Sequence, residues 1–129
     1  DTWLADDKPV FVPRYAVPVA QGVALVRASG GVAVLAHPWG RGRREHLSPD
    51  VLADLARGGL DGIEVDHQDH DQATRDELRG LAGELNLLAT GSSDYHGTGK
   101  VDHDLGCNTT APDVLDAIRA RVAERGGLL

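Results

Sequence analysis

The chain has 129 residues, and its 13 Lys and Arg against 20 Asp and Glu leave a formal net charge of −7. This acidic balance argues against general binding to duplex DNA, which needs a broad basic face, but not against a nucleotide held by a few local Arg residues. With 41% apolar residues, a single cysteine and no apolar run long enough to span a membrane, the sequence predicts one packed domain of the cytoplasm over residues 1–129, without an internal disulfide.

Helices and strands alternate along the predicted chain. Residues 1–18 form an irregular lead-in that prolines interrupt. Apolar spacing then predicts helices over 19–29, 49–57 and 72–85, with a last helix that begins near Pro112. Apolar runs predict strands at 32–36, 62–65 and 87–90, and a short extended segment follows near 105–109. Short connections between alternating strands and helices imply right-handed crossovers and a parallel sheet, and therefore an α/β fold.

Several details of these elements can be tested. The first strand is a continuous apolar run, which is typical of a strand that is buried on both faces. Ser48 followed by proline predicts the start of a helix, and Thr110 is the expected cap of the last helix. The buried stripe of that last helix is expected to contain Val114, Leu115, Ile118 and Val122.

Histidine and aspartate follow each predicted strand. His37 follows the first strand, His67 and His70 follow the second, and Asp94 and His96 follow the third. Because the carboxyl ends of parallel strands meet at one edge of a sheet, these side chains are expected to lie together. Imidazole and carboxylate suit Mn, Fe and Zn, so the pattern predicts a divalent metal site.

Other roles stay open for some of these residues. His67 and His70 lie in an acidic loop that can equally be a solvated surface. His103 either supports a ligand or faces solvent, and His46, next to a basic run, is expected to be exposed. Cys107 has no motif around it and is interpreted as a small buried hydrophobic residue.

An Arg-rich run begins four residues after His37. Arg41, Arg43 and Arg44 lie in a loop with two glycines, and guanidinium groups on such a loop can hold a phosphate. A solvated loop with surface charge is the alternative. Trp39, at the start of this loop, either packs over a base or covers the loop.

Three motifs, in this order, resemble segments of the PHP (polymerase and histidinol phosphatase) family. They are the run Gly30–Pro38 that ends in Ala36-His37-Pro38, the strand Gly62-Ile63-Glu64-Val65 with its histidine loop, and Gly91–Gly97 with Asp94-Tyr95-His96. The likeness extends over about residues 10–125. The downstream segment Leu105–Thr110 also resembles the branch of small bacterial metal-dependent phosphoesterases.

The resemblance implies a distorted TIM-like (β/α)7 barrel with two or three divalent metals at its strand ends. It implies that His37, Asp94 and His96 are metal ligands. In this branch of the family, an Arg shortly after the His-Pro pair holds the substrate phosphate. Arg41, Arg43 and Arg44 compete for that role, and Arg14 resembles a further position on the substrate side.

One part of the family pattern has no counterpart in this chain. The opening His-x-His motif and the ligands of the first barrel strands are absent, and there is no Met at residue 1. The chain is therefore expected to be the C-terminal portion of a PHP-type barrel, whose N-terminal half is its missing partner. The fragment alone is expected to lack a complete active site.

The intact protein is expected to hydrolyse phosphate esters of a small molecule, a nucleotide or a short oligonucleotide. His67 or His70 would protonate the leaving oxygen, which is work suited to imidazole near neutral pH. The alternative is a non-catalytic PHP-like domain with a binding or assembly role. A metal-dependent amidohydrolase is a weaker alternative, because an amide substrate carries no phosphate for the Arg-rich loop to hold.

Overall fold

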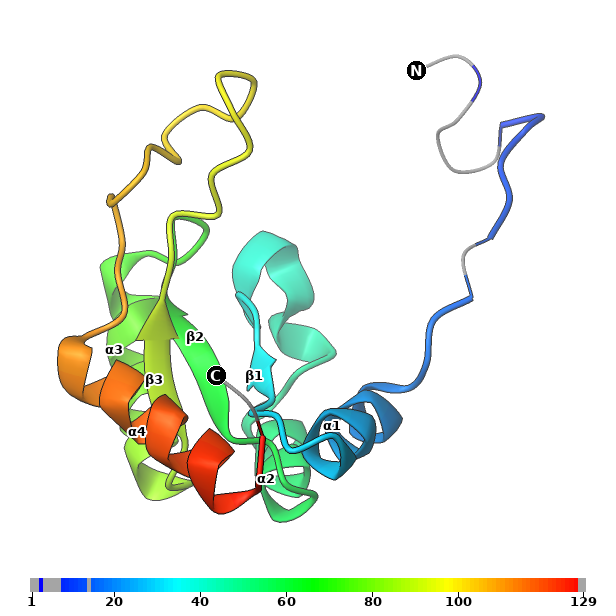
Figure 1. Cartoon of the computed structure of the whole chain (residues 1–129). Helices are drawn as coiled ribbons and strands as arrows, with labels where there is room; N and C mark the ends of the chain where they lie inside the picture. The colour runs from blue at the N-terminus through cyan, green and yellow to red at the C-terminus, as the bar shows by residue number, and fades with distance from the viewer. Residues whose placement is uncertain (1–2, 4–7, 14, 128–129) are drawn as a thin grey trace.

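Three parallel strands form the sheet of the computed structural model, which describes residues 3, 8–13 and 15–127. In spatial order the strands are β1 (Val34–Leu35), β2 (Gly62–Asp66) and β3 (Leu88–Gly91). Ile63 in the central strand pairs with Leu35 on one side and with Ala89 on the other. The predicted α/β arrangement with a parallel sheet is confirmed, and the described strands form an open sheet (Figure 1).

Four α-helices and one short 3-10 helix connect and follow the strands in the described part of the chain. They are α1 (Val19–Ala28), η1 (Gly40–Glu45), α2 (Pro49–Arg57), α3 (Gln72–Glu84) and α4 (Pro112–Glu124). The Ser48 side chain accepts a hydrogen bond from the Val51 amide, and Asp71 accepts one from the Thr74 amide at 2.8 Å. These caps satisfy amide groups of the first helical turn, which is why α2 and α3 begin where they do.

The core lies between the sheet and the helices that pack on it. Ile63 and Val65 in β2, Leu52 in α2 and Leu78 in α3 have no exposed surface. Helix α3 contacts β2 and β3, and α4 contacts β3. The loops that follow all three strands leave from the same edge of the sheet, at the top of Figure 1.

The first strand differs from its prediction. It has two residues instead of five, and Val34 is 36% exposed, so the run is not buried on both faces. In the described part of the chain no strand pairs with the outer edge of β1. The apolar run therefore has the composition of an interior strand, although it occupies an edge.

The segment around α4 also differs from its prediction. The Thr110 hydroxyl donates to the Gly91 carbonyl at 2.9 Å and accepts from the Gly91 amide at 3.1 Å, so it ties the end of β3 and does not cap α4. Leu115 is 42% exposed, and Val122 is the buried residue of the predicted stripe. Residues 105–109 form turns and bends, and Cys107 is exposed.

The described residues of the lead-in contribute nothing to the core. Residues 8–13 and 15–18 form no helix or strand, as predicted, and all of them are exposed. In Figure 1 this segment runs away from the sheet. Among the described residues, no helix has both the length and the apolar character needed to cross a bilayer.

Candidate metal centre

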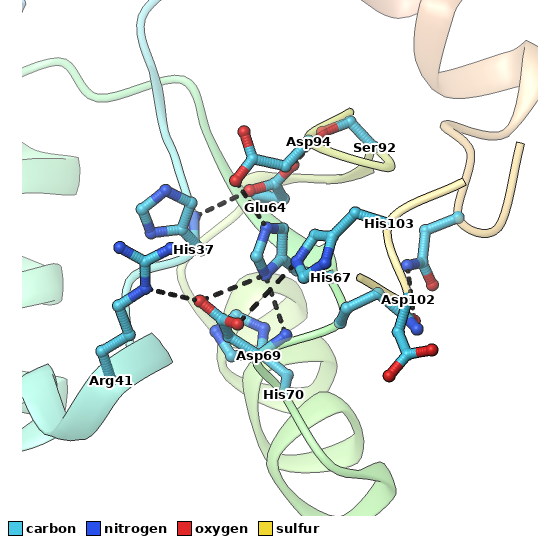
Figure 2. A network of polar contacts seen from close by, with 12 residues as sticks. His37, Arg41, Glu64, His67, Asp69, His70, Ser92, Asp94, Asp102 and His103 are labelled. Carbon is cyan, nitrogen blue, oxygen red and sulfur yellow. Dashed lines mark hydrogen bonds and ion pairs between the residues drawn. The ribbon is translucent and has the colours of Figure 1, made fainter. Parts of the chain in front are cut away.

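The ends of the three strands bring two imidazoles and a carboxylate together. His37 follows β1, His67 follows β2 and Asp94 follows β3 (Figure 2). One ligand atom from each residue lies within 4.8 Å of the other two. Two imidazole nitrogens and a carboxylate oxygen form a donor set that suits Zn, Mn or Fe.

His37 occupies an unusual backbone position. Its φ angle of 29° lies in the left-handed region, which a residue with a side chain adopts at a cost. Its backbone amide donates a hydrogen bond of 2.8 Å to Glu64 Oε2. The His37 Nδ1 atom is buried and has no hydrogen-bond partner among the described residues. A buried nitrogen without a partner is unusual, and it is the observation that a metal ion would account for.

His67 is completely buried and neutral at pH 7. Burial lowers its pKa, while Glu64, Asp94 and Asp69 act in the opposite direction. The Asp69 amide donates to His67 Nδ1 at 3.0 Å, so the proton of the neutral ring is assigned to Nε2. The Nε2 atom lies 3.4 Å from Asp94 Oδ2. Neutral imidazole is the form that binds metals, but to bind through Nε2 the ring must take the other tautomer, with its proton on Nδ1, and give up the hydrogen bond from the Asp69 amide.

Asp94 is ionised over the whole physiological range. A hydrogen bond from the Lys100 ammonium is the main reason that its pKa lies far below the usual range. Burial opposes this shift, and His96 and His67 add to it. Asp94 also has a left-handed backbone, with a φ angle of 51°. The carboxylate is therefore available as a ligand, although Lys100 competes for the same Oδ2 atom.

A second group with metal-ligand character shares His67 with the first. It joins His67 to Asp69 and His103, and His103 Nε2 is buried without a hydrogen-bond partner, 3.9 Å from Asp69 Oδ1. The Nδ1 atom of His67 accepts the Asp69 amide hydrogen, and its Nε2 atom faces Asp94. We take the group with His37 and Asp94 as the candidate metal centre, because its three members follow the three strands. His103 lies against the centre, so it does not face solvent.

The other two predicted residues lie beside this group. The His96 side chain is 69% exposed, and its Nε2 contacts Asp94 Oδ1 at 3.0 Å, outside both candidate groups. His70 is 2% exposed; its Nδ1 bonds to the Val65 carbonyl at 2.9 Å, and its Nε2 is buried without a partner. The Arg75 guanidinium bonds to the carbonyl oxygens of His67 and His70, which holds their loop in place.

The arginines of the Arg-rich run point to different places. Arg41 Nε donates to Asp69 Oδ2 at 3.2 Å, which places this half-exposed side chain beside the histidines. Arg44 instead pairs with Glu77 on α3 and lies over the Trp39 ring at 4.2 Å. No ion pair of Arg43 occurs in the described part of the chain, and Arg14 lies outside the described residues.

Trp39 is a core residue, so it does not pack over a base. It is 6% exposed and donates from Nε1 to the Leu47 carbonyl at 2.7 Å, and thereby closes the loop that it begins. His46 is exposed, as predicted. His37, His67, His70 and His103 form a histidine cluster, and Asp69 lies against it. Of the predicted phosphate-binding residues that the structure describes, Arg41 alone forms a hydrogen bond to Asp69.

Sequence reasoning missed three residues of this region: Glu64, Ser92 and Lys100. Glu64 Oε1 accepts a 2.6 Å hydrogen bond from the Ser92 hydroxyl, and Lys100 pairs with Asp94. One signal for Glu64 was present, because it is the single charged residue inside the predicted strand at 62–65. A charge at such a position needs a reason. Lys100 lies in a loop and gives no comparable signal.

Comparisons with known proteins point to phosphoesterases. No family model matches the chain. The chain is 44% identical over 88 residues to a phosphoribosyl 1,2-cyclic phosphate 1,2-diphosphodiesterase of Eggerthella lenta, and these residues form 67% of the chain and 32% of that enzyme. It is 27% identical over 116 residues to a 3',5'-nucleoside bisphosphate phosphatase of Chromobacterium violaceum, over 90% of the chain and 41% of that enzyme.

The chain is also similar to a solved crystal structure of a phosphoesterase. The protein, from Bifidobacterium adolescentis and assigned as a metal-dependent phosphoesterase, matches with a TM-score of 0.82 and 32% identity. The match covers 97% of this chain and 42% of the crystal structure's chain. The chain thus spans between about a third and two fifths of the length of the proteins that it matches.

Proposed function

We propose that the chain is the C-terminal portion of a metal-dependent phosphoesterase of the PHP type. The observation that carries this proposal is the meeting of His37, His67 and Asp94 at the ends of three parallel strands, with a buried unpartnered nitrogen among them. The names of the relatives, a cyclic phosphodiesterase and a bisphosphate phosphatase, support the reaction class.

In this proposal His37 and Asp94 are ligands, and His96 joins them when its exposed ring turns from Asp94 toward the ion. A divalent ion held there, Mn, Fe or Zn, supplies activation of water and neutralises charge on the phosphate oxygens. The residues of this chain then have three tasks. They hold the ion, they hold the phosphate, and they deliver a proton to the leaving oxygen.

Arg41 is the residue that we assign to the substrate phosphate. Its guanidinium lies beside the histidine cluster and is tied to Asp69 by one hydrogen bond, with a side chain that is 59% exposed. A phosphate that approaches the centre can bind the guanidinium donors of Arg41 that Asp69 leaves free. We expect a phosphorylated small molecule or a nucleotide as the substrate. Arg43 and Arg14 stay candidates for a second contact.

His67 has two possible roles, as a ligand or as the proton donor. Its Nε2 atom faces Asp94, whereas His70 Nδ1 is engaged by the Val65 carbonyl, so His67 is the better placed of the two predicted rings. The donor role requires a ring that is protonated on both nitrogens, which the burial that lowers the pKa of His67 opposes. The roles differ in a measurable way. Loss of a ligand lowers the metal content of the protein, whereas loss of a general acid lowers kcat and leaves the metal in place.

The open edge of β1 is where we place the N-terminal part of the barrel. Val34 is 36% exposed in a strand that no described strand covers. A groove of about 310 Å³ runs beside it between α1 and β1, lined by apolar side chains that include Val23, Val26 and Val32. A strand that pairs with β1 would cover Val34 and satisfy the outer edge of the sheet.

The test uses the chain joined to its upstream segment, with Mn²⁺ added and a nucleoside 3',5'-bisphosphate and a ribose cyclic phosphate as substrates. His37→Ala and Asp94→Ala are each expected to lower kcat/KM at least about 100-fold and to lower the bound metal measured by mass spectrometry. His46→Ala changes an exposed imidazole and serves as the control.

Two results would contradict the proposal. Near-parental hydrolysis by both variants would show that the chemistry lies elsewhere. A parental protein that holds metal but hydrolyses neither ester would favour the alternative of a binding or assembly domain.

A further inference from the structure

Glu64 is a buried carboxylate at the centre of the sheet. It lies in β2, between β1 and β3, and is 6% exposed. Both of its oxygens are engaged: Oε2 accepts from the His37 amide at 2.8 Å, and Oε1 accepts from the Ser92 hydroxyl at 2.6 Å. Figure 2 shows the carboxylate between the loop of His37 and the loop of Asp94.

These two hydrogen bonds join the segments that carry the candidate ligands. One of them ends on the backbone of His37 itself, and the other ends on Ser92, two residues before Asp94. Both His37 and Asp94 have left-handed backbones, with φ angles of 29° and 51°. Strained backbone of this kind persists only where the surroundings hold it. Glu64 forms hydrogen bonds to both segments.

The donors to Glu64 are neutral. Among the described residues no Lys, Arg or His forms an ion pair with this carboxylate, although a buried charge normally has a cationic partner. The negative charge of Glu64 therefore acts on the neighbouring imidazoles without a countercharge from the protein. A cation held by those imidazoles would lie in the field of this carboxylate.

We propose that Glu64 is a positioning residue that sets His37 and the Asp94 loop for a divalent cation before the cation binds. The inference rests on the proposed function, because it takes His37 and Asp94 as the ligands. Outer hydrogen bonds that orient the groups around a metal commonly change its affinity by about 10- to 100-fold when they are removed. Glu64 acts on the backbone of one ligand and on the loop of the other, and it does not touch the substrate.

Three variants of the 129-residue chain separate geometry from charge and from simple packing. Glu64→Gln keeps the size of the side chain but removes the charge and one of the two acceptors. Glu64→Asp keeps the charge and shortens the reach. Ser92→Ala removes the contact to the Asp94 loop and leaves the His37 contact in place.

The measurements are the affinity for Mn²⁺ by calorimetry and the NMR shift and hydrogen exchange of the His37 amide without metal. Glu64→Gln and Glu64→Asp are expected to weaken Mn²⁺ binding about 10- to 100-fold, and Ser92→Ala less. In both Glu64 variants the His37 amide is expected to move upfield and to exchange faster, as the bond to the carboxylate weakens. A merely structural role would lower the unfolding temperature without this specific change.

The inference would be overturned if Glu64→Gln bound Mn²⁺ with the parental affinity, or if Glu64→Asp did. The second result would mean that charge, and not position, is what Glu64 supplies. Failure of the proposed function looks different, because the chain joined to its upstream segment would then bind Mn²⁺ with the Glu64 dependence intact and still hydrolyse no phosphate ester.

Discussion

The buried carboxylates at the two ends of the central strand β2 are paired differently: Asp61 has cationic partners, and Glu64 has neutral ones. Just before β2, Asp61 is 3% exposed and is surrounded by cations. The Arg125 guanidinium forms two hydrogen bonds to its carboxylate, at 2.5 and 2.8 Å, and Arg121 adds one at 3.4 Å. The Ala33 amide donates as well, at 3.0 Å. This end of the sheet is closed, because each oxygen of Asp61 has its donors within the chain.

At the carboxyl end of the same strand, several buried polar groups lack such partners among the described residues. Glu64 has only neutral donors there, and buried nitrogen atoms of His37, His70 and His103 have no hydrogen-bond partner in the described part of the chain. Buried polar groups without partners cost stability, so a fold keeps them where something else supplies the partner. At one end of the sheet the buried carboxylate is paired within the chain and stabilises the fold. At the other end the unpartnered buried nitrogen atoms lie at the candidate metal centre.

Removal of the Asp61 carboxylate is expected to have the largest effect on stability. Asp61→Ala leaves Arg125 without its buried partner and is expected to lower the free energy of unfolding by about 3 kcal/mol, measured by urea denaturation. The Mn²⁺ affinity of the folded protein is expected to stay within twofold of the parental value. If the affinity fell in parallel with the stability, the two ends would be coupled, and the comparison would be wrong.

The pH dependence of stability is the next effect in size. Burial raises the pKa of Asp61, but the hydrogen bonds from Arg125 and Ala33 and the charges of Arg125 and Arg121 outweigh it, so the folded-state pKa lies below the usual value. The unfolded chain therefore binds a proton at a higher pH than the folded chain does. The contribution of Asp61 is present above the unfolded pKa of about 3.9 and is lost as the pH falls through the folded pKa.

Unfolding of the parental chain and of Asp61→Asn between pH 7 and pH 3 measures this contribution. The difference in unfolding free energy between the two is expected to be constant above pH 5 and to shrink below pH 4. A difference that stays constant down to pH 3 would show that the ion pair contributes no pH dependence.

Periodicity was enough to predict the four α-helices and the places of the three strands, because each pattern depends on neighbours in the chain. It did not predict η1, where a loop was expected, or the turns and bends at residues 105–108, where an extended segment was expected. The starts of α2 and α3 follow from local caps, and the strand at β2 follows from its apolar residues. The errors concern contacts between distant segments. Thr110 bonds to Gly91 across 19 residues, and Val34 is exposed because of what lies beside β1 in space. No local pattern carries that information.

The candidate site divides in the same way. His37, His67 and Asp94 could be predicted because the end of a parallel strand is a position that sequence patterns reveal. His103 could not be placed, since its loop reaches Asp69 from 34 residues away in the chain without a motif of its own. Glu64 could have been found as the one charge in an apolar strand, but its partners could not, because they lie on the other two strand ends.

The smallest expected effect concerns two arginines, one at each end of the central strand. Arg125 at the closed end is 21% exposed and is bound by Asp61 in a fork, whereas Arg41 at the carboxyl end is 59% exposed and holds Asp69 by one bond. The pairing of Arg41 is weak enough for a phosphate to replace it. Arg44 is the matched control, because it lies in the same short helix but pairs with Glu77 on α3.

Arg41→Ala is expected to raise KM for a phosphate ester about 10-fold and to leave kcat within about threefold, because Arg41 holds the bound phosphate before and during the reaction. Arg44→Ala is expected to leave KM unchanged and to change the stability of the fold little, because the ion pair that it removes is exposed. Equal KM values for the two variants would mean that the phosphate is held by another residue. A higher KM for Arg44→Ala alone would indicate that the substrate phosphate binds on the Trp39 side of the loop, away from the histidines.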